Sequence, residues 1–341
     1  MSLNAPFPWF GGKRRVAPLI WERFGDVDNY VEPFFGSGAV LLNRPTKHRA
    51  RTETVNDLDG FVANFWRAVA HDPESVAHYA DWPVNEIDLN ARHSWLVRHR
   101  PELALRLEGN PEHYDAKIAG WWVAGVCGWI GSGYCSGAGP WVVRDGLMVN
   151  SRQSAEGNSG RGINRQMPHV SNSGQGINRQ MPHISNSGQG DFIADWFHAL
   201  ATRLRNVRVL SGDWSRSLSE SVTTRHGITG VLLDPPYGEE VEQTRVYACD
   251  SGTVSDDVRA WCIENGNDAR LRIALCGYGG EGHDALLDYG WTTHAWSAAG
   301  GYGGGRGGRG DENRHRERIY FSPACQAEDM GLLSLIAEEP A

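Results

Sequence analysis

The chain has 341 residues, of which 40% are hydrophobic, so it is long enough to bury a core as one large α/β domain with an insertion or as two ordinary domains. It contains neither a signal-peptide core nor an apolar run that could span a bilayer, and we therefore expect a cytoplasmic protein with no membrane association. A net charge of −8 argues against a nucleic-acid binder that uses its whole surface, although arginine recurs without matching acid in residues 151–190 and 306–318. The six cysteines lack the CxxC spacing of zinc sites, which predicts reduced thiols and no structural metal.

Short apolar runs that end in Gly, Asp or Asn turns alternate with helical patterns, which predicts a parallel sheet covered by helices. The predicted strands are residues 29–33, 53–56, 207–211, 230–234 and 271–276. Helical periodicity marks residues 61–69 and 192–204, and Asp191 is expected to cap the second of these helices. Residues 291–296 and 318–322 are expected to form an antiparallel pair at the edge of the sheet.

Between about residues 74 and 190 this alternation is lost, which indicates an inserted domain. Within it, residues 162–175 are repeated almost unchanged as residues 176–189. Two such short copies do not make a solenoid, and a duplication of this kind hints at a rapidly changing genome, such as that of a phage. Two interpretations stay open: an exposed loop that tolerates changes in length, or a loop that reads base edges and phosphates. On the second interpretation the DNA-binding residues are Asn164, Arg165, Asn178 and Arg179.

Three segments near the N-terminus suit a nucleotide-like ligand. The stretch WFGGK, from Trp9 to Lys13, combines an aromatic ring, two glycines and a cation. The first predicted strand breaks at Pro33 and enters the glycine turn EPFFGSG before a helix, a layout that cradles such ligands. Asp57 ends the next strand about twenty positions later, where an acidic residue binds ribose hydroxyls in such folds, although a helix cap is the ordinary alternative.

The stretch DPPY, from Asp234 to Tyr237, follows a predicted buried strand. Proline has no backbone N–H, so two prolines stop the pairing of strands and leave a rigid loop rich in acceptors. Asp234 adds a carboxylate to this loop and Tyr237 adds a flat stacking face. A rigid turn at the end of a strand is the alternative interpretation.

Taken in this order, the four motifs resemble those of the Dam-type (D12 class) DNA adenine N6-methyltransferases, over about residues 1–70 and 191–323. The resemblance implies an α/β fold with a Rossmann-like, S-adenosylmethionine-dependent methyltransferase sheet and an inserted target-recognition domain. The implied boundaries are a catalytic domain at residues 1–73 and 191–325, the inserted domain at 74–190 and a C-terminal tail at 326–341. S-adenosylmethionine is the implied cofactor, and DNA, expected to be double-stranded, is the implied substrate.

The resemblance also assigns roles to single residues. The expected catalytic residues are Asp234, Pro235, Pro236 and Tyr237. The expected cofactor contacts are Trp9, Gly11, Gly12, Lys13, Glu32, Pro33, Phe34, Gly36, Gly38, Asp57, Asp213 and Asp234. Asp213 would contact the cofactor's adenine, although an exposed aspartate at the end of a strand is also an ordinary turn former.

Several alternatives stay open from the sequence. The same scaffold could modify cytosine N4 or RNA, or could bind DNA without turnover. A nucleotide-binding protein of metabolism is a third alternative, disfavoured by the absence of other phosphate motifs. Near-helical spacing favours buried packing over a base-stacking platform for Trp121, Trp122, Val126, Trp129 and Ile130. The sequence leaves open the target site, the oligomeric state and whether a partner nuclease exists.

Overall fold

The structure is a computed structural model that describes residues 3–9, 12–48, 52–82, 85–110, 112–129, 134–135, 141–144, 147–150, 192–236, 254–296 and 316–326. In these ranges the strands are β1 (Asn29–Glu32), β2 (Thr52–Asp57), β3 (Trp141–Arg144), β4 (Leu147–Asn150), β5 (Val207–Ser211), β6 (Thr229–Leu233), β7 (Leu271–Tyr278), β8 (Thr292–Ala295) and β9 (Glu317–Phe321). The α-helices are α1 (Ala17–Phe24), α2 (Ala39–Leu42), α3 (Gly60–His71), α4 (Pro73–Ala80), α5 (Glu86–Gly109), α6 (Ala116–Gly128), α7 (Phe192–Leu204) and α8 (Val254–Asn265). None of the described helices is long and apolar enough to cross a membrane.

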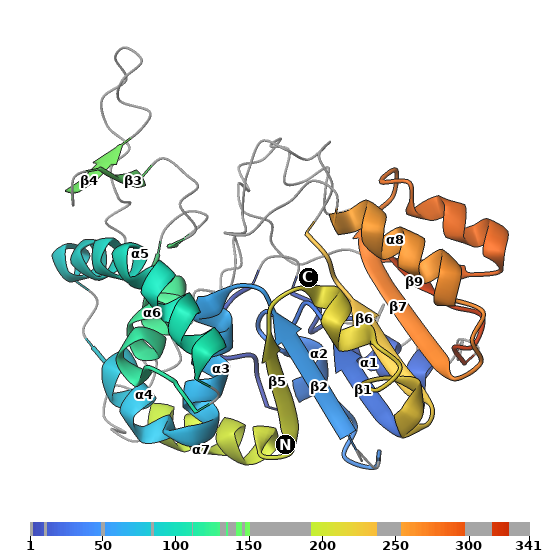
Figure 1. Cartoon of the computed structure of the whole chain (residues 1–341), viewed down its shortest axis with the longest axis horizontal. Helices are drawn as coiled ribbons and strands as arrows, with labels where there is room; N and C mark the ends of the chain where they lie inside the picture. The colour runs from blue at the N-terminus through green and yellow to red at the C-terminus, as the bar shows by residue number, and fades with distance from the viewer. Residues whose placement is uncertain are drawn as a thin grey trace, which may run out of the picture.

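A seven-stranded sheet in the order β5-β2-β1-β6-β7-β9-β8 is the centre of the fold (Figure 1). The first five of these strands are parallel, and β9 runs antiparallel to both β7 and β8. All the predicted strands of this sheet and the predicted antiparallel pair are confirmed, with ends that move by no more than two residues. The α/β fold with a Rossmann-like sheet is therefore confirmed.

Both faces of the sheet are covered, and successive residues of its strands enter opposite cores. In β6, for example, Leu232 joins one hydrophobic cluster while Val231 and Leu233 join the other. All five residues of β6 are buried. Because side chains alternate across a strand, a strand covered on both faces shows a continuous apolar run, as this one does.

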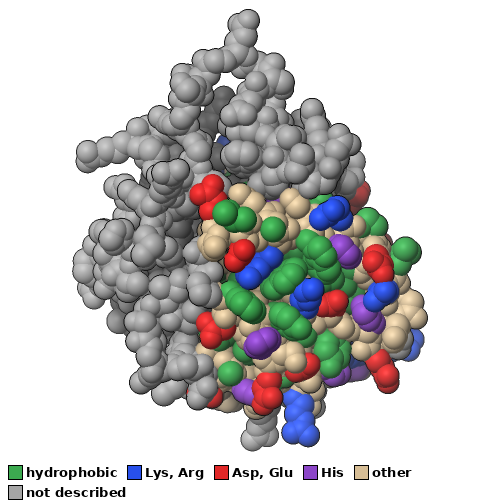
Figure 2. All heavy atoms as spheres, turned by 90° about the vertical axis from the view of Figure 1, so that its left-hand side faces the viewer, with side chains coloured by type: hydrophobic (Ala, Val, Ile, Leu, Met, Phe, Trp, Pro, Cys, Tyr) green, Lys and Arg blue, Asp and Glu red, His purple; other side chains and the backbone are tan. Residues whose placement is uncertain are grey.

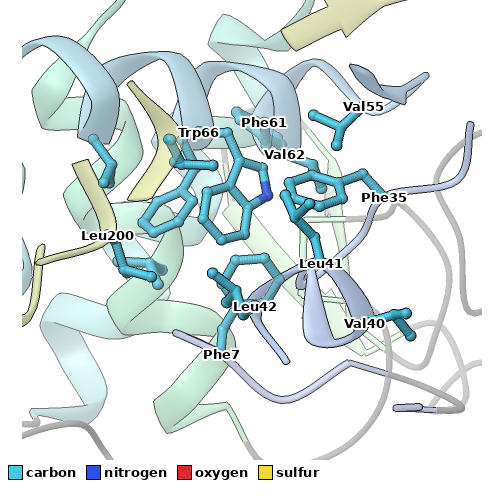
Figure 3. Packing of buried hydrophobic residues seen from close by; sticks show 14 of the residues in the cluster. Phe7, Phe35, Val40, Leu41, Leu42, Val55, Phe61, Val62, Trp66 and Leu200 are labelled. Carbon is cyan, nitrogen blue, oxygen red and sulfur yellow. The ribbon is translucent and has the colours of Figure 1, made fainter. Parts of the chain in front are cut away.

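The larger core lies beneath α3, whose N-terminus is capped by the side chain of Asp59. Trp66 packs against Phe35 with ring centroids 4.9 Å apart, and both rings lie among the buried side chains of Figure 3. The indole N–H of Trp66 donates to the carbonyl of Gly36 over 2.9 Å. Hydrophobic packing on α3 thus fixes the loop that follows β1.

Helices α3–α7 gather at the β5 end of the sheet, and the β3–β4 hairpin projects from this group (Figure 1). The predicted helix at residues 192–204 is confirmed as α7, whereas Asp191 lies outside the described residues. Arg203 of α7 forms two hydrogen bonds, of 2.6 and 2.8 Å, with the buried carboxylate of Glu53 in β2. This bidentate pair ties α7 to β2 of the sheet.

The proposed inserted domain contributes α4, α5, α6 and the hairpin. Its division from the catalytic domain stays a prediction, as does the separate C-terminal tail. Figure 2 views the outer side of the helical group and shows acidic, basic and hydrophobic side chains interspersed. Asn164, Arg165, Asn178 and Arg179, together with the whole tandem repeat, lie outside the described residues.

Candidate active site

The candidate site lies where the parallel strands β1, β2 and β6 end. The chain leaves β1 toward β2 on one side, while β6 pairs with β1 on the other side. Such a reversal of strand order opens a crevice at the carboxyl ends of the strands, which is where open α/β sheets bind ligands. Glu32, Asp57 and Asp234 stand at these three strand ends.

The glycine turn after β1 adopts a backbone that requires glycine. Gly36 has φ +47° and Gly38 has φ +68°, both in the left-handed region. The amide of Gly36 donates to a carboxylate oxygen of Asp57 over 2.8 Å. A Cβ atom at Gly36 would lie 2.4 Å from the indole nitrogen of Trp9, so the first motif lies directly against the second.

We expect Gly36→Ala to disrupt this turn. The new methyl group would force Trp9 to move and would hold alanine in a left-handed conformation, which together cost roughly 1–3 kcal/mol of folding stability. The binding free energy of a ligand held by this turn should fall by more than the free energy of unfolding does. Gly109→Ala is the matched control, because no atom lies within 4 Å of its Cβ position. Thermal unfolding and calorimetric binding of S-adenosylmethionine measure both effects, and equal behaviour of the two variants would contradict the expectation.

Asp57 is held between the glycine turn and the start of α3. Besides the bond from Gly36, it accepts a 2.9 Å hydrogen bond from the backbone amide of Asp59. Burial, with a smaller contribution from the nearby Asp59 carboxylate, raises the pKa of Asp57 to about 7. A carboxyl group with this pKa is poised to ionise when a cation or a hydrogen-bond donor arrives.

Lys13 and Asp234 form the central ion pair, with 2.8 Å between the ammonium nitrogen and a carboxylate oxygen. The Lys13 side chain is 4% exposed and that of Asp234 is 21% exposed. Burial lowers the pKa of Lys13, but the Asp234 carboxylate, with a further contribution from Glu317, outweighs burial and raises that pKa overall. For Asp234, burial raises the pKa and the charge of Lys13 opposes it. The ammonium group of Lys13 therefore stays protonated and favours an ionised Asp234.

Glu32 is almost fully buried, and its carboxyl group accepts a 2.8 Å hydrogen bond from the hydroxyl of Tyr30. Burial raises the pKa of Glu32 well above its usual value, and the nearby Asp234 carboxylate adds to the effect. Three acidic groups with raised pKa values thus stand at the ends of β1, β2 and β6. A cation placed among them would favour their ionised forms.

Two residues that sequence reasoning missed shape the site. The Asn56 amide donates to the carbonyls of Pro33 and Gly212, over 3.0 and 2.9 Å, and so ties the end of β1 to the end of β5. Trp214 stacks on Phe34, with ring centroids 6.1 Å apart and planes inclined at 26°. The sequence signal for Asn56 is its place beside Asp57 at a strand end, whereas nothing local pairs Trp214 with Phe34.

The other expected site residues differ in where they lie and in whether the structure describes them. Asp213 caps a short 3-10 helix through a 3.0 Å bond from the amide of Ser215, so the turn-forming interpretation is confirmed and contact with adenine stays a prediction. Pro235 is buried beside Asp234, and Pro236 is partly buried. Gly11 and Tyr237 lie outside the described residues.

The tryptophans in α6 and directly after it pack against the core, which is the role that their near-helical spacing predicted. Trp122 is 2% exposed in the main core, and Trp121 and Trp129 pack partly buried against it. Trp121 is also covered by the cations of Lys117 and Arg92, at 4.4 and 5.3 Å from its ring centroid. These rings are packed or covered by side chains, and Ile130 is not among the described residues.

No curated protein matches the chain. One family matches a segment that contains the first three motifs and ends before Asp234. That segment, residues 9–96, matches the family described as D12 class N6 adenine-specific DNA methyltransferase, which confirms the resemblance seen in the sequence.

Proposed function

We propose that this chain transfers the methyl group of S-adenosylmethionine to the N6 amine of an adenine in DNA. The family match supports DNA adenine methylation in general. The single observation that carries the finer proposal is the buried Lys13–Asp234 pair, which joins the first and last motifs across 2.8 Å at the carboxyl end of β6. A loop that served only to end a strand would have no need of this buried charge pair.

The residues at these strand ends fit S-adenosylmethionine. At Gly36 and Gly38 the positions that a Cβ atom would take lie against the rings of Trp9 and Phe35, so the left-handed turn is held close to the end of β1. Glu32, Asp57 and Asp234 supply acidic groups suited to the ammonium, sulfonium and ribose hydroxyl groups of this ligand. When bound, the cofactor would supply an electrophilic methyl group on a sulfonium.

Asp234 and Pro235 would act on the acceptor amine. An ionised carboxylate only accepts hydrogen bonds, so Asp234 and the Pro235 carbonyl can each take one of the two amino hydrogens of adenine. That arrangement favours a pyramidal nitrogen with its lone pair free for attack. The charge of Lys13 opposes the rise that burial causes in the pKa of Asp234, and so favours the ionised form that this role requires. Positioning and preorganised charge would then supply the rate without a covalent intermediate.

The target adenine is stacked inside duplex DNA, so it must be extruded before its amine can reach Asp234. In the proposed mechanism Tyr237 stacks on the extruded base. This proposal is tested with methyl-labelled S-adenosylmethionine and mixed-sequence duplex DNA, with single-stranded DNA and RNA as parallel substrates. Label in duplex DNA supports the proposal, whereas label confined to RNA would contradict it.

The pKa of Asp57 predicts that cofactor affinity depends on pH. Below about pH 7 the carboxyl group is protonated in the free protein, and above it the group is ionised and available to a donor. Affinity should therefore rise as the pH rises, by up to about tenfold between pH 6 and pH 8 if only the ionised form binds.

The measurement is the Kd of S-adenosylmethionine by calorimetry across this range. The cofactor's own α-amino group also titrates near pH 8, so Asp57→Asn is needed as the control. The variant should bind more weakly and lose the part of the pH dependence that Asp57 supplies. A wild-type Kd that is flat from pH 6 to pH 8 would contradict the role given to Asp57.

A binding module without turnover is the main rival. It predicts cofactor and DNA binding with no labelled product. The pairing of Lys13 with Asp234 argues against this rival. Removing an ion pair from water costs free energy, and a surface that only binds DNA would gain no function from such a pair at this position.

A further inference from the structure

A buried tyrosine lies directly behind the acidic strand ends of the candidate site. Tyr30 in β1 is 0% exposed, and its hydroxyl donates to a carboxyl oxygen of Glu32 over 2.8 Å. Tyr30 belongs to the larger hydrophobic cluster and Val31 to the other, so Glu32 lies on the same face of the sheet as Tyr30. The hydroxyl therefore approaches Glu32 from within the core, whereas a ligand would approach Glu32 from the end of the strand.

The other two acidic residues of the site follow on this same face. Val55 in β2 and Leu232 in β6 belong to the larger cluster, and Asp57 and Asp234 each come two residues later. Strand β1 lies between β2 and β6 in the sheet. Glu32 is thus the middle member of the three acidic residues.

Aromatic packing fixes the ring of Tyr30. Its centroid lies 4.7 Å from the nearest ring centroid of Trp21 and 6.2 Å from that of Phe24, and all three side chains are fully buried. The indole N–H of Trp21 donates to the carbonyl of Val40 over 2.7 Å, which holds that ring in turn. Because a protein core is close-packed, the hydroxyl cannot leave Glu32 without displacing these rings.

A second acid beside Tyr30 is balanced in a different way. Glu53 pairs with Tyr30 in the register of β1 and β2, and its buried carboxylate binds the guanidinium groups of Arg203 and Arg44. Two cations thus neutralise Glu53, whereas Tyr30 gives Glu32 a hydrogen bond without a charge. Glu32 therefore keeps the capacity to balance a cation that arrives from outside.

The hydroxyl of Tyr30 also favours the ionised form of Glu32. Burial raises the pKa of Glu32 well above its usual value, and the hydrogen bond from Tyr30 opposes that rise. An ionised carboxylate only accepts hydrogen bonds, so a donor stabilises it more than it stabilises the neutral acid. Removal of the hydroxyl would therefore raise the pKa of Glu32 further.

Other described groups that act on Glu32 come from neighbouring elements. They are Asp57 in β2, Asp234 in β6 with its partner Lys13, the thiol of Cys276 in β7 and the backbone amide of Leu41 in α2. The two aspartates raise the pKa of Glu32 and the amide lowers it. All of these groups stay in place when Tyr30 loses only its hydroxyl, so a comparison with the wild type isolates the effect of that hydroxyl.

Another buried tyrosine makes the same kind of bond under different conditions. Tyr320 in β9 is 0% exposed, and its hydroxyl donates to a carboxylate oxygen of Asp284 over 2.7 Å. Asp284 lies exposed, so water solvates its charge. Glu32 is 4% exposed, and burial of an acid is costly unless it is compensated. A buried acid that is kept at a ligand-binding edge and held by a buried donor points to a role in binding.

We propose that Tyr30 is a positioning residue that holds the carboxyl group of Glu32, and favours its ionised form, for a cationic group of S-adenosylmethionine. The inference rests on the proposed function, because it takes S-adenosylmethionine as the ligand. Tyr30 acts through Glu32 and lies in the core behind it. Loss of the hydroxyl should therefore weaken cofactor binding most where Glu32 is hardest to ionise, which is at low pH.

The experiment measures the Kd of S-adenosylmethionine by calorimetry for the wild type and for Tyr30→Phe, which keeps the buried ring. At pH 6 we expect the variant to bind about tenfold more weakly, as the loss of a hydrogen bond to a charged group implies. The deficit should shrink toward one as the pH rises to 9, because Glu32 then ionises in both proteins. Titration of Asp57 and of the ligand's amino group is common to both proteins and cancels in the ratio.

Tyr320→Phe is the matched control, since it removes the hydroxyl of a buried tyrosine elsewhere in the sheet. Its Kd should stay within about twofold of the wild type at every pH. A deficit in Tyr30→Phe that Tyr320→Phe shares, or one that is constant from pH 6 to pH 9, would overturn the inference. It would show that the loss comes from general damage to the core.

A double variant tests whether Tyr30 acts through Glu32. Glu32→Gln removes the charge but keeps an oxygen that accepts from Tyr30, and Tyr30→Phe added to it should change the Kd by less than about twofold. A tenfold loss that persists in the Glu32→Gln background would overturn the inference. A wild type that binds S-adenosylmethionine without methylating DNA would overturn the proposed function alone, and one that does not bind it would overturn both.

Discussion

Asp234→Asn should leave the protein folded and lower the rate of methyl transfer by on the order of 10³-fold. The substitution keeps the shape of the side chain but replaces the acceptor-only carboxylate with an amide that also donates. It also removes the charge that faces the acceptor amine. The measurement is single-turnover transfer of label from S-adenosylmethionine to DNA.

Folding of this variant is expected to survive because Lys13 keeps a second acidic neighbour. The buried carboxylate of Glu317 also raises the pKa of Lys13, so the ammonium group is not left in a neutral environment when Asp234 loses its charge. Asp234→Ala should remove activity in the same way. Asp268→Asn, at an exposed ion pair before β7, is the control with a matched chemical change. Near wild-type turnover by Asp234→Asn would defeat the role proposed for this residue.

Lys13→Met should produce the second large loss. Breaking a buried ion pair by removing one partner costs about 3 kcal/mol, which corresponds to roughly a hundredfold in rate if the cost falls on the active ionisation state of Asp234. Without the ammonium group, burial raises the pKa of Asp234 further, so less of it is ionised at pH 7. Arg14→Met removes an exposed cation next in sequence and should be nearly silent.

The pH profile separates this mechanism from simple damage. Since the missing cation raises the pKa of Asp234, ionisation is recovered as the pH rises, and the deficit of Lys13→Met should shrink at higher pH. The rate of the variant relative to the wild type, measured from pH 6 to pH 9, checks the sign. A ratio that is constant over this range would show that Lys13 does not act through the ionisation of Asp234.

Local sequence patterns predicted the framework of the site well. Runs such as residues 230–233 are apolar throughout because both faces of the strand are buried, and turn residues mark where each strand ends. The carboxyl ends of parallel strands lie at one edge of a sheet, which is why the motifs at the ends of β1, β2 and β6 come together in the structure. The positive φ values at Gly36 and Gly38 agree with the turn that was predicted there.

The partners of these motifs were not foreseeable from local patterns. Lys13 and Asp234 are separated by more than half of the chain, and no periodicity links a lysine in one loop to an aspartate in another. Asn56 was missed because an asparagine at a strand end is usually a turn former, whereas here it bonds two other loops.

The most direct test of the account is the chemical identity of the methylated product. Duplex DNA is incubated with methyl-labelled S-adenosylmethionine and the wild-type chain, digested to nucleosides and analysed by mass spectrometry, with Asp234→Asn in parallel. The account predicts labelled N6-methyladenine with the wild type and a loss of on the order of 10³-fold with the variant. Label on cytosine N4 would contradict the proposed target base, and cofactor binding without any labelled nucleoside would contradict the proposed activity.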